Sequence, residues 1–312
     1  MKILVSGSLA FDKIMNFPGK FSDHILPEKI HQINLSFAVQ DLKENFGGTA
    51  GNIAFNLALL SENSIVLAAA GNDFSSYAEW LKNNNVNVDL VNVIADEKTT
   101  CAFITTDSVD NQITAFYMGA MKYTGKTPDK NLLSDAWAIV APGNVEDMVA
   151  LPKLYKEHGV PYIFDPGQQL PVMSADNLRD GIIGANVLIS NDYELSLIMD
   201  KIGWNEAKIL ENVEILVTTL GEKGALIKTK SEIYSIPPAH PENTCDPTGA
   251  GDAFRAGFIK GLINGWPVEI AGKFASVVAV YTVEKYGTQT HKFNFEEVDK
   301  RYKNNFNELL PK

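Results

Sequence analysis

Short apolar segments recur along the chain, and several of them end in Gly, Asp or Asn. They lie at residues 2–8, 64–71, 136–143, 160–167, 185–192 and 214–221. Segments that can form helices separate them, such as AGNIAFNLALLSE at 50–62 and VEDMVALPKLYKEH at 145–158. Apolar strands that alternate with helices are typical of a parallel sheet with helices on both faces. The pattern therefore predicts an α/β fold that binds its ligand beyond the carboxyl ends of the strands.

Residues 13–46 and 98–118 lack this alternation. The second stretch has two strand-forming runs around the turn-forming sequence DSVDN, which predicts a β-hairpin. The first could supply partner strands, for example around HQINLSFAV at 31–39. We interpret both stretches as a small β-sheet lid; the alternative is that they are edge strands of the main sheet. The expected division is a nucleotide-binding core (1–12, 47–97 and 119–312) and a lid (13–46 and 98–118).

The charge and composition of the chain limit the kinds of binding partner to be expected. The 312 residues include 27 Lys and Arg against 38 Asp and Glu, a formal charge of −11. An acidic surface repels phosphate backbones and anionic lipids, so nucleic acid and membranes are not expected as partners. Two cysteines make no disulfide framework, and five scattered histidines show no metal-ligand spacing. We therefore expect a cytoplasmic protein without a zinc site.

The segment DPTGAGDAFRAGFI at 246–259 carries the strongest chemical signal. Gly249, Ala250 and Gly251 are small residues that open a predicted helix, and Asp252 lies in its first turn. Free N–H groups and the positive end of the helix dipole make such a turn an anion site. Phosphoryl transfer needs both these donors and a carboxylate base that prepares the attacking hydroxyl. The alternative is that Asp252 only stabilises the helix start.

This segment resembles the C-terminal signature of the ribokinase-like (PfkB) carbohydrate kinases, with Asp252 at the position of the catalytic base. GGTAGNIA at 47–54, followed by Ser61 and Gly71, resembles the other family signature. The resemblance implies a three-layer α/β/α sandwich with a central, mostly parallel sheet and a small β-sheet lid. It also implies that Gly249, Ala250, Gly251 and Asp252 form the catalytic turn.

Two shorter elements resemble the rest of the family site. NDYE at 191–194 matches the N-x-x-E element, which implies that Asn191 and Glu194 organise Mg²⁺, largely through water. TLGEKG at 219–224 resembles the nucleotide loop. The residues expected at ATP are then Asn191, Thr219, Leu220, Gly221, Glu222, Lys223, Gly224 and Gly251. Taken alone, these elements fit a helix start and a β-turn equally well. Related kinases often need K⁺, and carbonyl groups near Asp246 and residues 283–287 could supply such a site.

The acceptor side begins at GSLAFD, residues 7–12, where the Asp12 carboxylate can accept hydrogen bonds from two vicinal hydroxyls. The alternative is a simple turn aspartate. Gly47 and Gly48 resemble the family hinge between lid and body. Within the family, the chain is most similar to bacterial adenosine kinases. This implies that the nucleoside is contacted by Ser8, Asp12, Ser36, Gly47, Gly48, Asn52, Gln168 and Gln169.

Phe103 and Phe116, on the expected lid, are candidates to stack on a base; the alternative is that they pack within the lid or a dimer. The sequence thus predicts an ATP- and Mg²⁺-dependent kinase for the ribose 5′-hydroxyl of a nucleoside, with adenosine converted to AMP in purine salvage. Alternatives are a broad-specificity nucleoside kinase, a ribose or fructose kinase, or a non-catalytic nucleoside-binding protein. An exposed apolar lid face predicts a homodimer through the lid.

Overall fold

The protein, described here as a computed structural model for residues 1–25, 36–109 and 111–311, has a nine-stranded main sheet. All six apolar segments of the sequence form strands in it. The order is β13 (Ile233–Ile236), β12 (Ala225–Thr229), β11 (Ile215–Thr219), β10 (Val187–Asn191), β9 (Tyr162–Phe164), β8 (Ala136–Val140), β1 (Lys2–Ser6), β4 (Ser64–Gly71) and β5 (Val91–Ile94). Neighbouring strands from β11 to β5 run parallel, whereas β12 runs antiparallel to both of its neighbours, β11 and β13.

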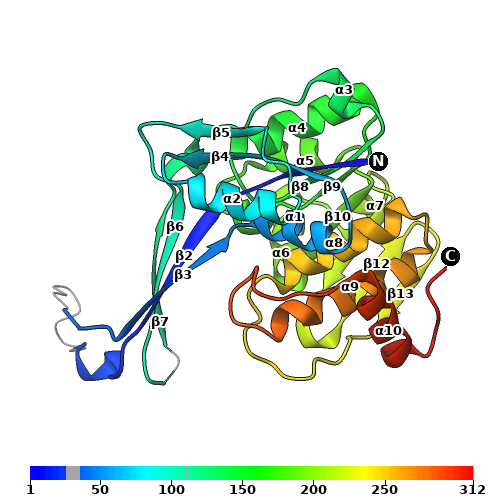
Figure 1. Cartoon of the computed structure of the whole chain (residues 1–312). Helices are drawn as coiled ribbons and strands as arrows, with labels where there is room; N and C mark the ends of the chain where they lie inside the picture. Colours follow the sequence, from blue (N-terminus) through cyan, green and yellow to red (C-terminus); the bar gives the residue numbers. More distant parts are fainter. Residues whose placement is uncertain (26–35, 110, 312) are drawn as a thin grey trace.

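Helices cover both faces of this sheet, because side chains along each strand alternate between two hydrophobic cores. Ile3 and Val5 belong to one core and Leu4 to the other. The first core includes α1 (Thr49–Leu59), α2 (Ser75–Asn83), α8 (Ala250–Ile263) and α9 (Val268–Val283). The second includes α3 (Lys130–Leu133), α4 (Val145–His158), α5 (Ala175–Ile182), α6 (Asp192–Ile202) and α7 (Glu206–Leu210). The predicted three-layer α/β/α sandwich is confirmed (Figure 1).

The terminal helix α10 (Phe295–Phe306) packs on α9. Short 3₁₀ turns occupy Phe21–Asp23, Gly119–Lys122, Gly167–Gln169 and Gly221–Lys223. None of the helices in the described ranges is long and apolar enough to cross a membrane.

A separate four-stranded sheet projects from the body (Figure 1). Its order is β3 (Asp41–Gly47), β2 (Ala10–Asn16), β6 (Thr100–Thr106) and β7 (Gln112–Tyr117). The hairpin predicted at 98–118 is confirmed as β6 and β7, and the alternative of main-sheet edge strands is wrong. The partner strand suggested around 31–39 is not found at 36–39, and residues 31–35 lie outside the described residues. Instead, β3 pairs with β2, which follows directly from β1.

Candidate active site

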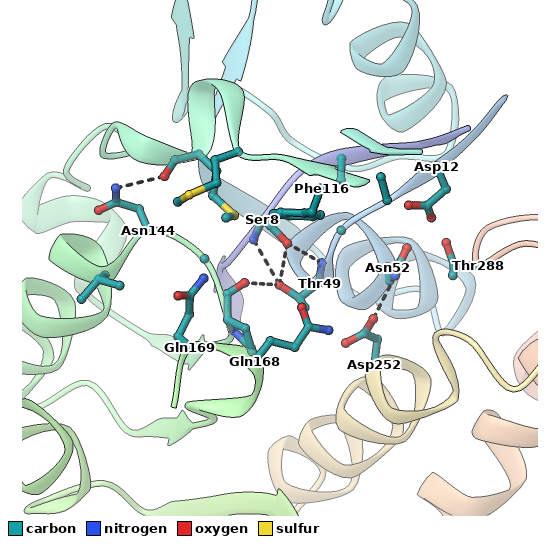
Figure 2. A pocket seen from close by; sticks show the side chains of 18 of the residues that line it. Ser8, Asp12, Thr49, Asn52, Phe116, Asn144, Gln168, Gln169, Asp252 and Thr288 are labelled. Atoms are coloured by element: carbon teal, nitrogen blue, oxygen red, sulfur yellow. Dashed lines mark hydrogen bonds between the residues drawn. The ribbon is translucent and has the colours of Figure 1, made fainter. Parts of the chain in front are cut away.

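A cavity of about 790 Å³ lies where the small sheet meets the carboxyl ends of the main-sheet strands (Figure 2). This volume falls within the roughly 300–1,000 Å³ of typical small-molecule sites. Its walls combine residues from β2, β7, α1, the loops after β8 and β9, and the start of α8. The residues singled out from the sequence that line it are Ser8, Asp12, Gly48, Asn52, Phe116, Gln168, Gln169, Gly249 and Asp252.

Ser8 and Thr49 hold the start of α1 at the floor of the cavity. The Thr49 N–H donates to Ser8 Oγ at 3.0 Å, and Ser8 N–H donates to Thr49 Oγ1 at 3.1 Å. Gly48 precedes the helix with φ of 88°. A Cβ there would come within 2.6 Å of the Ser8 carbonyl oxygen, so this connection requires glycine.

Asp12 enters the same cavity from β2, at the root of the small sheet (Figure 2). Burial raises the pKa of its carboxyl to about 6, and the nearby charge of Asp246 adds to this. Gly47 leaves room for the carboxylate, because a Cβ at Gly47 would lie 2.5 Å from Asp12 Oδ2. Of the two expected hinge glycines, Gly48 has a positive φ and Gly47 does not.

Asp252 stands in the first turn of α8, after Gly249 with φ of 81°. The N–H groups of Gly251 and Asp252 have no acceptor among the described residues. Asn52 Nδ2 donates to Asp252 Oδ2 at 2.8 Å (Figure 2). Burial raises the pKa of Asp252 to about 6, although Arg255 and the Asn52 hydrogen bond act to lower it. The turn thus combines free donors with a carboxylate whose pKa lies close to neutral pH.

A second cavity of about 220 Å³ shares Asp252, Gly249 and Gln168 with the first. Asn191, Glu194 and Thr219 also line it. Asn191 and Glu194 form a capping box at α6, in which Asn191 Oδ1 accepts from the Glu194 N–H at 2.7 Å and Glu194 Oε2 accepts from the Asn191 N–H at 2.9 Å. No cluster of three His, Cys, Asp or Glu side chains that could hold a metal directly occurs in the described part of the chain.

An ion pair that the sequence analysis missed borders this smaller cavity. Arg255 Nε donates to Asp165 Oδ2, and both side chains are buried. Asp165 Oδ1 is buried too and has no hydrogen-bond partner among the described residues. A Cβ at Gly251 would lie 2.8 Å from Arg255 Nη1, so glycine lets the guanidinium approach the turn. Arg255 falls within the segment 246–259, one helical turn after Asp252, and this spacing was the available signal.

Several residues chosen from the sequence lie elsewhere. Phe103 does not line the large cavity, because β6 and β7 pair Ala102 with Phe116 on the cavity face and Phe103 with Ala115 on the other. Ser36 is exposed and outside the cavity lining. The residues expected at the site that line neither cavity are Ser36, Gly47, Phe103, Leu220, Gly221, Glu222, Lys223, Gly224 and Ala250.

Further cavity residues carried weak signals or none. Asn144 follows β8, as polar residues follow other strands, and Nδ2 of Asn144 donates to the Met121 carbonyl at 3.0 Å (Figure 2). Thr288 comes from the segment after α9, where no motif marked it. Met118, Met121 and Val172 add an apolar wall. The fold places these residues at the cavity, and no local sequence pattern marks them.

Comparison with known proteins gives a consistent picture. The family model for pfkB family carbohydrate kinase matches residues 11–293. Nucleoside kinases of Methanocaldococcus jannaschii and Methanothermobacter thermautotrophicus are 33% and 31% identical, over 96% of this chain and 96% and 95% of theirs. The solved structure of Burkholderia thailandensis nucleoside kinase in complex with inosine is 37% identical, with a TM-score of 0.85, covering 98% of this chain and 99% of that chain. With its ribokinase-like fold and both signatures in place, this chain belongs to the pfkB family of carbohydrate kinases.

Proposed function

We propose that this protein is an ATP-dependent nucleoside kinase that phosphorylates the ribose 5′-hydroxyl of adenosine and related purine nucleosides. The observation that carries the proposal is the place of Asp252, which lines both cavities. The larger cavity under the small sheet suits an acceptor, and the smaller, polar cavity beside the anion turn suits the ATP phosphates. A carboxylate between acceptor and donor is where phosphoryl transfer needs its base.

The larger cavity supports a nucleoside as the acceptor. Asp12 would accept hydrogen bonds from ribose hydroxyls, and Phe116 would stack on the base, which is worth about 1–3 kcal/mol. Gln168 and Gln169 line the same cavity, so their side-chain amides can face a bound base. A free amide can present either its oxygen or its nitrogen. These side chains would therefore serve adenine and hypoxanthine alike, which favours a broader purine set over adenosine alone.

The chemistry follows from the first turn of α8. Asp252, with a pKa of about 6, is mostly ionised at neutral pH and can take the proton of the 5′-hydroxyl. The free N–H groups of Gly251 and Asp252, with the charge of Arg255 behind them, would stabilise the phosphoryl group in flight. Movement of the small sheet towards the body would exclude water and limit ATP hydrolysis.

The smaller cavity fits Mg²⁺ held largely through water. Asp165 Oδ1 is buried without a partner among the described residues, and Glu194 Oε1 stays outside the capping box. Asn191, Glu194 and Asp165 would hold the ion, whose charge would offset that of the phosphates. K⁺ dependence stays a prediction. The Val283 carbonyl, from the segment named for K⁺, already accepts the N–H groups of Cys245 and Asp246.

A transfer assay with radiolabelled ATP tests the function. Adenosine, inosine, cytidine, ribose and fructose are offered in turn, and 5′-deoxyadenosine serves as the matched control without an acceptor hydroxyl. We expect label on adenosine and inosine, with kcat/KM for the free sugars lower by roughly 100-fold because they lack a base to bind. Label on 5′-deoxyadenosine, sugars as good as nucleosides, or ATP loss that needs no acceptor would contradict the proposal.

We also propose a homodimer through the small sheet. Leu42, Phe103 and Ile113 are 66%, 38% and 44% exposed. Strand alternation and register put all three on the face turned away from the cavity. Such an apolar face is suited to burial against a second copy. Light scattering should give a dimer mass, and Leu42→Lys with Ile113→Lys should give a monomer. A wild-type monomer at micromolar concentration would contradict this.

A further inference from the structure

Gln289 lies in the segment after α9 and contacts neither cavity, yet it holds three functional groups in place. Its Nε2 donates to Asn52 Oδ1 at 3.0 Å and to the Tyr77 hydroxyl at 2.6 Å. Its Oε1 accepts from Trp80 Nε1 at 3.1 Å. Gln289 is only 3% exposed. Because the side chain is buried, water is poorly placed to substitute for these hydrogen bonds.

The two ends of this network determine the direction of every hydrogen bond in it. An indole nitrogen can only donate, so the Gln289 oxygen must face Trp80 and its nitrogen must face Asn52. Asn52 therefore accepts with its oxygen and donates with Nδ2, which reaches Asp252 Oδ2 at 2.8 Å. At the other end, Tyr77 donates to the Gly47 carbonyl at 2.8 Å and can only accept from Gln289. The arrangement leaves Asn52 one orientation.

We propose that Gln289 is a positioning residue for phosphoryl transfer: through Asn52, it keeps an N–H directed at one oxygen of the Asp252 carboxylate. This inference rests on the proposed kinase function. A hydrogen bond donated to a carboxylate favours its ionised form. With Oδ2 occupied by Asn52, Oδ1 is the atom left to take the proton of the acceptor hydroxyl.

Other charged groups also act on Asp252, so the test must separate them from the network. Arg255 of α8 favours the carboxylate and Asp165 after β9 opposes it. Glu194 of α6 lies near both members of that ion pair. The charges of Asp252 and Asp12 both act to raise the pKa of Tyr77 in α2. Replacing Gln289 leaves Arg255, Asp165 and Glu194 unchanged and removes one hydrogen bond from Tyr77.

Gln289→Glu reverses the network, because both oxygens of a carboxylate accept. Asn52 is then expected to turn its nitrogen towards residue 289 and its oxygen towards Asp252, which fits only a protonated Asp252. The acidic limb of kcat against pH should move to higher pH by about one unit. Asn304→Asp, the same amide-to-carboxylate change at an exposed position of α10, is the matched control and should leave the profile unchanged.

Two further variants keep the inference testable if a buried carboxylate at position 289 prevents folding. Gln289→Met removes all three hydrogen bonds, and Trp80→Phe removes the donor that sets their direction. Both should lower kcat by roughly 3–10-fold and move the acidic limb in the same direction, with ADP binding unchanged. Folded, ADP-binding variants with the wild-type pH profile would overturn the inference while leaving the kinase function intact. A wild-type protein that transfers no phosphate would instead reject the proposed function itself.

Discussion

The buried ion pair between Asp165 and Arg255 provides a quantitative test of how the catalytic turn is supported. The side chains are 2% and 9% exposed. Removing one partner leaves the other charge buried without the group that pairs with it directly, which costs about 3–5 kcal/mol. Asp165→Leu and Arg255→Met should each lower the unfolding free energy by this amount. For a chain of this size, that corresponds to a fall in melting temperature of roughly 5–8 °C.

The double variant discriminates this explanation from simple loss of packing. With both side chains replaced, neither member of the pair is left without its partner, so the double variant should lose clearly less stability than the two single variants together. Urea denaturation of the nucleotide-free protein measures all four corners of the cycle. Glu211→Leu, which breaks the exposed pair with Lys208, should cost under about 1 kcal/mol. Single losses below about 1 kcal/mol at the buried pair, or strict additivity, would refute the reasoning.

Two predictions concern the acceptor cavity. Asp12 and Asp252 both have pKa values raised to about 6, so activity should fall as the pH drops through this value and both carboxylates become protonated. Below this pH, a plot of log kcat/KM against pH should approach a slope of two. Asp12→Asn should leave a slope of one. A slope of one in the wild type would show that only one carboxylate must be ionised. Phe116→Ala should lower kcat/KM for adenosine by roughly 10-fold and leave the KM for ATP unchanged. Phe103→Ala, on the opposite face of the small sheet, should leave kcat/KM for adenosine unchanged. Equal effects of the two substitutions would contradict the placement of Phe116 in the cavity.

Much of the fold could be predicted from the sequence, because the strands that form the centre of the sheet are buried on both faces. β1, β4, β8 and β10 are therefore apolar along most of their length. Strand β12 and the edge strand β13 beside it were missed for the opposite reason. They are short, partly exposed and carry residues such as Lys228 and Ser235, so periodicity does not distinguish them from loops.

Residues of the candidate site that belong to sequence motifs could be predicted, whereas residues that reach the site through long-range tertiary contacts could not. Gly249 and Gly251 before Asp252, and polar residues after strands such as Gln168 and Asn191, line one or both cavities. Phe103 and Phe116 could not be told apart, because a shift of one residue in the pairing of β6 and β7 exchanges the faces that they occupy. Gln289 and Asp165 meet their partners across 237 and 90 residues of sequence, and no local pattern records such contacts.

Asp252→Asn tests the central claim most directly, because it removes the base while nearly preserving shape and the helix start. With the nucleoside that the wild-type protein phosphorylates best, kcat should fall by roughly 100–10,000-fold. Binding of ADP, measured by calorimetry on the same samples, should stay within a few-fold of wild type. A variant that turns over at a rate near that of the wild-type protein would contradict the account.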